Sequence, residues 1–507
     1  MPGYKEYTEA SQALRSIRVE NFSGRWLDNT RYEYETANGR AVFDTSKRSS
    51  TPVRTFQPTP MPQAAPARGR QYTQAKSPDG RFEVNYRDGN IYLTVDGKES
   101  PLTTDGDLTK RIKFGSASWV YGEELNQQYA MGFSPNSRYL WYYMFDESQV
   151  KDYHIVLGHA DQQSRLYPEA YPKPGQPNPS VELFIYDTQT KSSQKVQVRD
   201  GAFDNGVGHY VYSILWRDDS SELIFQRANR LQSIIELCAA DPATGKLRVI
   251  DREANPSGWV EMNTWLDVTE GRPRRGGGTR TRTRITSEKS DVTQVVRVDS
   301  RKEVIWYMAA GTSTPYRHQL YSIDFKGNNR KLHTDPAFHH QVSLNESATA
   351  FMDVRSTSTE PPSLHFVSIA NSGNTSTPVA ASTVPTSGTN GFSPVQWYSF
   401  PTFDGTATLH GKIHKPRNFD PNKKYPVLLS VYGGPMPPSW GGTAETFSMP
   451  SALASAGYLI VEVYGRGGNG RGRQFRQAIY RKLGIVEIDD QAAGIEAMKQ
   501  FPWADTT

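Results

Sequence analysis

The feature that most constrains the fold is a strand–turn–strand pattern that recurs from about residue 25 to residue 370. Segments such as "RFEVNYRDGNIYLTVDG" (81–97), "VELFIYDTQTK" (181–191) and "HQLYSIDFKGN" (318–328) alternate apolar and polar side chains and close on Asp, Asn or Gly. A period of two is typical of strands with one buried face, and Asp, Asn and Gly favour tight turns. This part of the chain is therefore predicted to consist of antiparallel hairpins.

A weak repeat marks the turns between these strands. It consists of "SPDGRF" at 77, "SPNSRY" at 134, "WRDDSSELIF" at 216 and "LNESATAF" at 344, each a polar turn before an apolar strand. Irregular recurrence of such units predicts a β-propeller, whose blades take roughly 40–50 residues each. A pair of β-sandwiches is the alternative.

The pattern changes after a boundary segment at 371–395, which is rich in Ser, Thr, Pro and Gly. Beyond it, "YPVLLSVYGGP" (425–435) and "YLIVEVY" (458–464) predict strands buried on both faces, and "VEIDDQAAGIEAMKQ" (486–500) predicts a helix. Strands that alternate with helices indicate a parallel α/β sheet. A sheet of this kind with so few strands is unfinished, so we expect the chain to be truncated.

Composition excludes several classes of protein. The chain has 507 residues and a net charge of +5, and Cys238 is its only cysteine, so intrachain disulfides and cysteine metal clusters are excluded. No apolar run approaches the roughly 18 residues of a membrane helix, and the start lacks the apolar stretch of a signal peptide. The compartment stays open: cytoplasmic as the chain stands, periplasmic or secreted if a leader is missing.

Three motifs suggest ligands but have simpler explanations. "GRGGNG" (465–470) fits a dinucleotide fingerprint, yet Asp489 and Asp490 open a helix where the fingerprint needs an acid closing a strand. "GRPRRGGGTRTRTR" (271–284) resembles an RNA-binding segment but is expected to be a solvated loop. The pair His339–His340 lacks metal-ligand spacing and is expected at a surface or turn. We therefore expect no cofactor, no metal and no nucleic-acid partner.

Several long motifs in a consistent order resemble the dipeptidyl-peptidase IV branch of the prolyl oligopeptidase serine peptidases. They are "SWVYGEEL" (118–125), "FSPNSRYLWYYMFDES" (133–148), "YPKPGQPNPSVELFIYD" (171–187), "WVEMNTW" (259–265), "DPAFHHQVSLNES" (335–347), "YPVLLSVYGGP" (425–435) and "GRGRQFRQAIYRKLGIVEIDDQAAG" (470–494). The resemblance implies an eight-bladed propeller over residues 25–395, followed by an incomplete α/β-hydrolase domain over 396–507. Residues 1–24 are expected to pack near the hydrolase side.

The resemblance also implies a substrate. In the family, the double glutamate, here Glu123 and Glu124, captures the free α-ammonium of a peptide, so that N-terminal Xaa-Pro or Xaa-Ala dipeptides are released. Both carboxylates can reach one cation only if the strand gives way to a helical turn, where neighbours lie about 100° apart. Without a bound cation, at least one of the two should have a raised pKa.

A second role carried over from the family falls on Tyr432 of "VYGGP". Its hydroxyl is expected to donate to the oxyanion of the tetrahedral intermediate, and losing such a donor costs roughly 3–4 kcal/mol of transition-state stabilisation. The alternative is a core tyrosine at a strand end.

The sequence also departs from the family. No G-x-S-x-G elbow occurs, and the catalytic Ser, Asp and His are expected after "FPWAD" (501–505), beyond the last residue. Gly122 replaces a frequent glutamate, Tyr464 replaces an acidic residue, and 266–286 replace an aromatic strand pair.

The sequence thus predicts a serine dipeptidyl peptidase whose isolated chain is inactive. A non-catalytic propeller scaffold that binds peptide amino termini is the alternative. The expected partners are peptides with a free N-terminus, and a homodimer is compatible with the resemblance.

Overall fold

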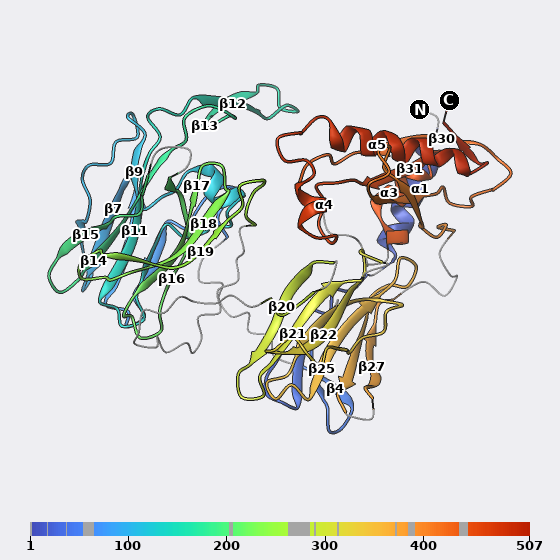
Figure 1. Ribbon diagram of the computed structural model, residues 1–507, viewed down its shortest axis with the longest axis horizontal. Helices are drawn as coiled ribbons and strands as arrows, with labels where there is room; N and C mark the ends of the chain where they lie inside the picture. The colour runs from blue at the N-terminus through green and yellow to red at the C-terminus, as the bar shows by residue number, and fades with distance from the viewer. Residues whose placement is uncertain are drawn as a thin grey trace. The chain divides into compact units, whose positions relative to one another are not determined.

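The computed structural model describes residues 3–506 except 18, 37, 54–64, 202–205, 262–283, 288–289, 312–313, 371–372, 384–390 and 436–444. The chain divides into two compact units, Thr59–Arg275 and the combination of Met1–Pro58 with Gly276–Thr507. The segment 266–286, which departs from the family, falls almost wholly outside the described residues. Each unit is built mainly from antiparallel sheets (Figure 1).

The unit Thr59–Arg275 contains three meander sheets, in which strands pair in chain order, and one separate hairpin. The first sheet is β5 (Gln74–Lys76), β6 (Phe82–Arg87), β7 (Asn90–Val95) and β8 (Lys98–Pro101). The second is β10 (Met131–Phe133), β11 (Tyr139–Asp146), β14 (Ser180–Asp187) and β15 (Ser192–Val196), with β9 (Ile112–Phe114) also pairing with β11. The third is β16 (Val207–Trp216), β17 (Leu223–Asn229), β18 (Ile234–Ala240) and β19 (Leu247–Ala254). The hairpin is β12 (Asp152–Leu157) and β13 (Arg165–Ala170), and helix α2 (Trp119–Glu123) follows β9.

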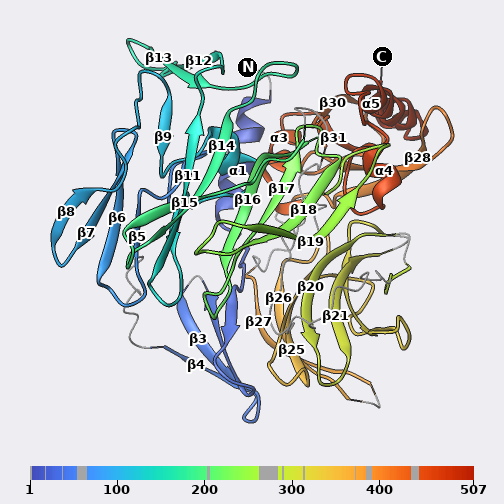
Figure 2. The same ribbon diagram turned by 60° about the vertical axis from the view of Figure 1, so that its left-hand side comes forward.

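The other unit contains three further meanders. They are β1 (Gly24–Trp26), β2 (Arg31–Thr36), β3 (Gly39–Asp44) and β4 (Ser49–Pro52); β20 (Val292–Asp299), β21 (Val304–Ala310), β22 (His318–Asp324) and β23 (Lys331–Leu332); and β24 (His339–Leu344), β25 (Ala350–Ser356), β26 (Ser363–Ser368) and β27 (Thr375–Ala381). The described residues thus hold six blade-like sheets, while the expected number of eight stays a prediction. Figure 2 labels β20 and β21 of one of these sheets and β25, β26 and β27 of another.

The last sheet of this unit differs from the others in strand order and direction. Its order is β28 (Gln396–Pro401), β29 (Thr408–His414), β31 (Leu459–Tyr464), β30 (Tyr425–Ser430) and β32 (Ala504–Asp505). Only the β31–β30 and β30–β32 pairs are parallel, so the sheet is mixed and not wholly parallel as predicted. Strand β30 is also not buried on both faces, because Leu428 is 46% exposed.

Helices complete this part of the chain. They are α1 (Tyr4–Arg15), the short 3₁₀ turn η1 (Glu445–Phe447), α3 (Met449–Ala454), α4 (Arg473–Gln477), α5 (Val486–Ala497) and η2 (Met498–Gln500). Helix α1 packs on α3, and Ala10 and Ala452 share a buried cluster with Ile17, which follows α1.

The domain limits at 24 and 395 remain predictions. No helix among the described residues is long and apolar enough to cross a membrane.

The weak sequence repeat corresponds to one recurring turn. In each copy the first residue donates its backbone N–H to the carbonyl five positions later, and the residue three positions later donates back to the first carbonyl. The bonds that span five positions join Ser77 to Phe82, Ser134 to Tyr139, Arg217 to Glu222 and Asn345 to Ala350. The fourth residue of each turn has a positive φ, between 52° and 75°, which only Gly80 among the four adopts without a steric cost.

Successive turns in the unit Thr59–Arg275 are also linked to each other. The backbone N–H of Asp79 donates to the Ser137 hydroxyl at 3.1 Å, and that of Asn136 donates to the Ser220 hydroxyl at 3.0 Å. The hydroxyl of one turn therefore holds the backbone of the turn before it, so neighbouring sheets keep a fixed offset.

One expectation about the histidine pair is wrong. His339 and His340 both lie on β24 and are buried, at 7% and 2% exposure, and not at a surface or turn. The Nδ1 atom of His340 lies 2.8 Å from the Asp353 carboxylate, and its Nε2 atom lies 2.7 Å from the Asp335 carbonyl. These partners come from strand β25 and a preceding turn, so they satisfy a polar ring inside the sheet.

Candidate functional site

The double glutamate lies at the end of α2, a helix of a single turn. Ser118 begins the helix in an extended conformation, and Glu124 ends it with helical dihedral angles. The predicted helical turn is therefore confirmed, and it brings the two carboxylates onto adjacent positions of one helix end.

Tyr121 fixes this short helix in the core. Its ring is 2% exposed and packs edge-to-face on Phe145 with centroids 4.8 Å apart. Its hydroxyl accepts a hydrogen bond from the backbone N–H of Val211 at 3.1 Å. Helices this short have little stability of their own, so the buried tyrosine is what holds α2 in place.

Gly122 is explained by the chain that runs beside α2. A Cβ atom at position 122 would lie 2.6 Å from the carbonyl carbon of Gly69, closer than side chains approach backbone. Gly69, with φ of +72°, would in turn meet the Trp119 ring. The missing family glutamate at 122 is therefore replaced by close backbone packing, and Glu123 and Glu124 keep their positions.

The segment beside α2 supplies a cation that sequence reasoning missed. The Arg68 guanidinium donates from two nitrogens to Oε1 of Glu123, while the Arg68 side chain is 81% exposed and that of Glu123 is 14% exposed. Hydrogen bonding from Arg68 lowers the pKa of Glu123 below its ordinary value. The raised pKa expected for a pair without a cation does not apply to Glu123, because the protein provides the cation.

Glu123 and Glu124 differ in accessibility. Glu124 is exposed and carries no hydrogen bond to its carboxylate among the described contacts, and both bonds from Arg68 fall on a single oxygen of Glu123. The Oε2 atom of Glu123 and the whole carboxylate of Glu124 are therefore available for donors from a ligand.

A second ion pair fixes the same segment. Arg70 pairs with the buried Glu169 of β13 and donates to the Tyr167 hydroxyl at 2.6 Å. The backbone N–H of Ala117 also donates to the Gln71 side chain at 3.0 Å. The segment that carries Arg68 is thus held at the two residues Arg70 and Gln71 that follow it.

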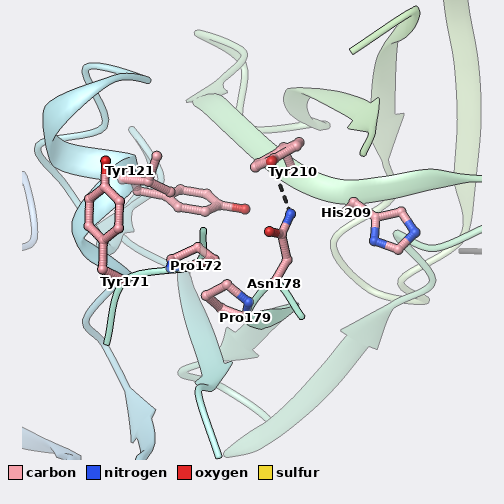
Figure 3. A pocket seen from close by; sticks show the side chains of 8 residues that line it. Tyr121, Tyr171, Pro172, Asn178, Pro179, His209 and Tyr210 are labelled. Atoms are coloured by element: carbon pink, nitrogen blue, oxygen red, sulfur yellow. Dashed lines mark hydrogen bonds between the residues drawn. The ribbon is translucent and has the colours of Figure 1, made fainter. Parts of the chain in front are cut away.

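A small cavity of about 100 Å³ lies next to α2 (Figure 3). Its lining is Val120, Tyr121, Tyr171, Pro172, Asn178, Pro179, His209 and Tyr210. The Asn178 amide donates to the Tyr210 hydroxyl at 2.9 Å across it. Because Val120 and Glu124 are four positions apart on the helix, the cavity wall and the exposed carboxylate share one face of α2.

Tyr432 lies in the other unit, two residues after β30. Its side chain is 55% exposed, so it is not a core tyrosine. Gly434 follows closely, since a Cβ atom there would lie 3.3 Å from the tyrosine ring. An accessible hydroxyl at the carboxyl end of a parallel strand suits a ligand-binding position in an α/β sheet.

The glycine-rich motif at 465–470 has a structural explanation. Asp490, fully buried on α5, accepts the backbone N–H of Arg466 at 2.7 Å and pairs with its guanidinium. The acid therefore holds the loop itself. Within the described ranges, no group of three or more His, Cys, Asp or Glu side chains could hold a metal ion.

Comparisons with known proteins identify the family. The family described as "Dipeptidyl peptidase IV (DPP IV) N-terminal region" matches residues 27–278 and 270–362, and "Prolyl oligopeptidase family" matches 445–507. Among curated proteins, a probable dipeptidyl-aminopeptidase B of Aspergillus terreus is 28% identical over 91% of this chain and 53% of its own length. Dipeptidyl peptidase 4 of Trichophyton rubrum is 24% identical over 95% of this chain and 64% of its own.

Solved structures show the same fold. The Porphyromonas gingivalis dipeptidyl peptidase 4 structure aligns with a TM-score of 0.68 and 23% identity, over 95% of this chain and 68% of that one. A putative dipeptidyl aminopeptidase IV from Bacteroides ovatus gives 0.66 and 21%, over 99% and 72%. The fold is a β-propeller followed by part of an α/β-hydrolase domain, as predicted. The chain spans about half of the first curated relative, and it belongs to the dipeptidyl peptidase IV branch of the prolyl oligopeptidase family.

Proposed function

We propose that this chain carries the amino-terminus-binding part of a serine dipeptidyl peptidase that releases Xaa-Pro or Xaa-Ala dipeptides. The observation that carries the proposal is the end of α2, where Glu124 is exposed and Glu123 is kept ionised by Arg68. A peptide ammonium has three donors, and these carboxylates leave three oxygens open for them.

Tyr432 is the proposed oxyanion donor. Its exposed hydroxyl follows the strand that an α/β-hydrolase places before its oxyanion loop. The nucleophile, its base and the orienting acid are proposed to be encoded after "FPWAD", and the proline pocket with them. The 507-residue chain is accordingly proposed to bind peptides without cleaving them, and a homodimer is the proposed assembly.

The experiment compares two tripeptides on the 507-residue chain by isothermal titration calorimetry. Gly-Pro-Gly with a free amine is expected to bind at least about tenfold more tightly than its N-acetyl form, because a charge-assisted hydrogen bond is worth roughly 1.5–3 kcal/mol. Equal affinities would show that α2 does not capture the amine. A coding sequence extended beyond residue 507 that lacked a serine elbow would refute the serine mechanism separately.

A further inference from the structure

A buried carboxylate with no hydrogen-bond partner lies far in the sequence from the glutamates of α2. Glu445 of η1 is 7% exposed, and both of its carboxylate oxygens are buried without a hydrogen-bond partner. An unsatisfied buried carboxylate is rare, because ionising it away from water without a partner is costly.

The groups that face Glu445 come from three elements. Strand β29 contributes Lys412, strand β31 contributes Glu462, and the segment before β22 contributes Tyr316 and Arg317. His414 of β29 and Tyr464 of β31 contact Glu462 behind them. These side chains form what we call the junction cluster.

Within the junction cluster the cations already have other direct partners. The Lys412 ammonium lies 2.9 Å from Oε2 of Glu462, and the Tyr464 hydroxyl donates to the same oxygen at 3.0 Å. His414 is buried next to the Ser451 hydroxyl at 2.8 Å, and burial lowers its pKa, which keeps the ring neutral. Arg317 is half-buried and donates to the Pro336 carbonyl at 3.3 Å. An ionised Glu445 would therefore be a buried charge without a direct partner, and the attraction of Lys412 and Arg317 from a distance does not offset the cost of burying it.

The residues of η1 next to Glu445 contact several other parts of this unit. The Thr446 backbone N–H donates to the Ser358 carbonyl, between β25 and β26, at 3.1 Å, and the Thr446 hydroxyl accepts from the Val395 N–H at 3.2 Å. Phe447 packs against the buried cluster that includes Ala10 of α1 and Phe392. The Tyr316 ring stacks on Trp397 of β28 with centroids 4.0 Å apart. Blade loops, hydrolase sheet and N-terminal helix thus meet around one residue.

From this arrangement we propose that Glu445 is a proton-dependent latch: its neutral acid closes the contact between the blade loops at Tyr316 and Ser358 and the hydrolase sheet, and its ionisation loosens that contact. Burial also raises the pKa of Glu445 above its ordinary value of 4.5. A folded-state pKa above the unfolded value means that the folded state binds the proton more tightly. The contact is therefore tightest at acidic pH and weakens as the pH rises through the folded-state pKa.

The experiment measures local amide hydrogen exchange of the 507-residue chain between pH 5.5 and 8.5, corrected for the pH dependence of intrinsic exchange. In the wild-type protein, peptides covering 314–320, 356–360 and 445–455 are expected to gain exchange with rising pH, about tenfold for each unit by which the pKa is raised. Peptides from the β5–β8 sheet serve as the internal reference and are expected to stay flat.

The matched variants are Glu445→Gln, which keeps the shape and removes the titration, and Glu496→Gln, which removes a carboxylate that is 57% exposed on α5. E445Q is expected to abolish the pH dependence of the three peptides, and E496Q to leave it intact. A pH-dependent gain that persists in E445Q would overturn the proposal, as would a wild-type protein whose three peptides show no gain at all. The wild-type measurement decides the latter even if E445Q does not fold.

Discussion

Glu123 and Glu445 are two acidic residues that the fold treats in opposite ways. Glu123 stands at the end of α2, beside an arginine that lowers its pKa. Glu445 is enclosed without a partner, and burial raises its pKa. Arg68 keeps Glu123 ionised, so its second carboxylate oxygen can accept a hydrogen bond from a ligand. Burial without a direct partner instead favours the protonated form of Glu445. The difference separates a residue suited to ligand binding from one suited to sensing pH.

The largest expected effect comes from Glu462, the enclosed carboxylate that does have a cation. Glu462→Gln leaves the buried Lys412 ammonium without its counter-charge and should lower the free energy of unfolding by about 3–5 kcal/mol. Urea unfolding at pH 7 measures this loss, with E496Q as the control. A loss no larger than that of E496Q would mean that Lys412 is adequately solvated.

Glu462 should also make the free energy of unfolding depend on pH in the acidic range. Lys412 and His414 lower the pKa of Glu462, against the effect of burial, to about 2. Because the folded-state pKa lies below the ordinary 4.5, the contribution of Glu462 is complete above pH 4.5 and is lost as the pH falls towards 2. Thermal unfolding in this window should show a smaller acid loss in E462Q than in the wild type.

The next effect concerns ligand binding at α2. The double variant Glu123→Gln, Glu124→Gln should weaken Gly-Pro-Gly binding by about 10- to 100-fold, the equivalent of one charge-assisted hydrogen bond. Calorimetry with the N-acetyl peptide should show no change. Glu182→Gln, on β14 of the same unit, is the control, since its carboxylate pairs with Lys195. Equal losses for both peptides would indicate a damaged fold and not a lost amine site.

A smaller change in stability is expected for Glu445→Gln. E445Q should be more stable than the wild type at pH 8.5, by roughly 1.4 kcal/mol for each unit of raised pKa, and equally stable at pH 4.5. The gain appears only where the wild-type acid is ionised in the folded state. Thermal unfolding at the two pH values tests this, and a gain of equal size at both would point to packing and not to charge.

The smallest effect on stability is expected for Arg68→Gln. Its guanidinium is largely exposed, so the melting temperature should stay within error of the wild type. The pKa of Glu123 should rise. As the pH is lowered, the variant should therefore lose its binding of a free-amine peptide at a higher pH than the wild type does. A pH titration of Gly-Pro-Gly affinity provides the measurement, and an unchanged profile would show that Arg68 does not set the charge of Glu123.

Local signals in the sequence predicted the parts of the structure that depend on neighbouring residues. Alternation predicted the hairpins, as in β6–β7, where Asp88 and Gly89 both adopt the positive φ that a two-residue turn needs. The helical turn at Glu123 followed from requiring two adjacent side chains to serve one cation. The fold of the whole came from several long motifs in order.

Contacts between distant residues could not be predicted in this way. Arg68 is 55 positions from Glu123, and nothing in "ARGRQ" specifies its partner. Glu445 precedes a short helix and has the pattern of an ordinary acidic helix start, so its enclosure depends on β29 and β31. The histidine pair was wrongly assigned to the surface because Asp353 and the Asp335 carbonyl, which satisfy His340, come from elsewhere in the fold.

The linked turns have a consequence for how such a repeat can vary. Ser137 and Ser220 each serve the turn that precedes them in the chain, and so neither hydroxyl is needed by its own hairpin. Replacing one would leave the donor unpaired one sheet upstream, while the altered hairpin kept its own bonds. Tolerance to mutation in this array is therefore set by the neighbour, and damage at one repeat should be detected in the one before it.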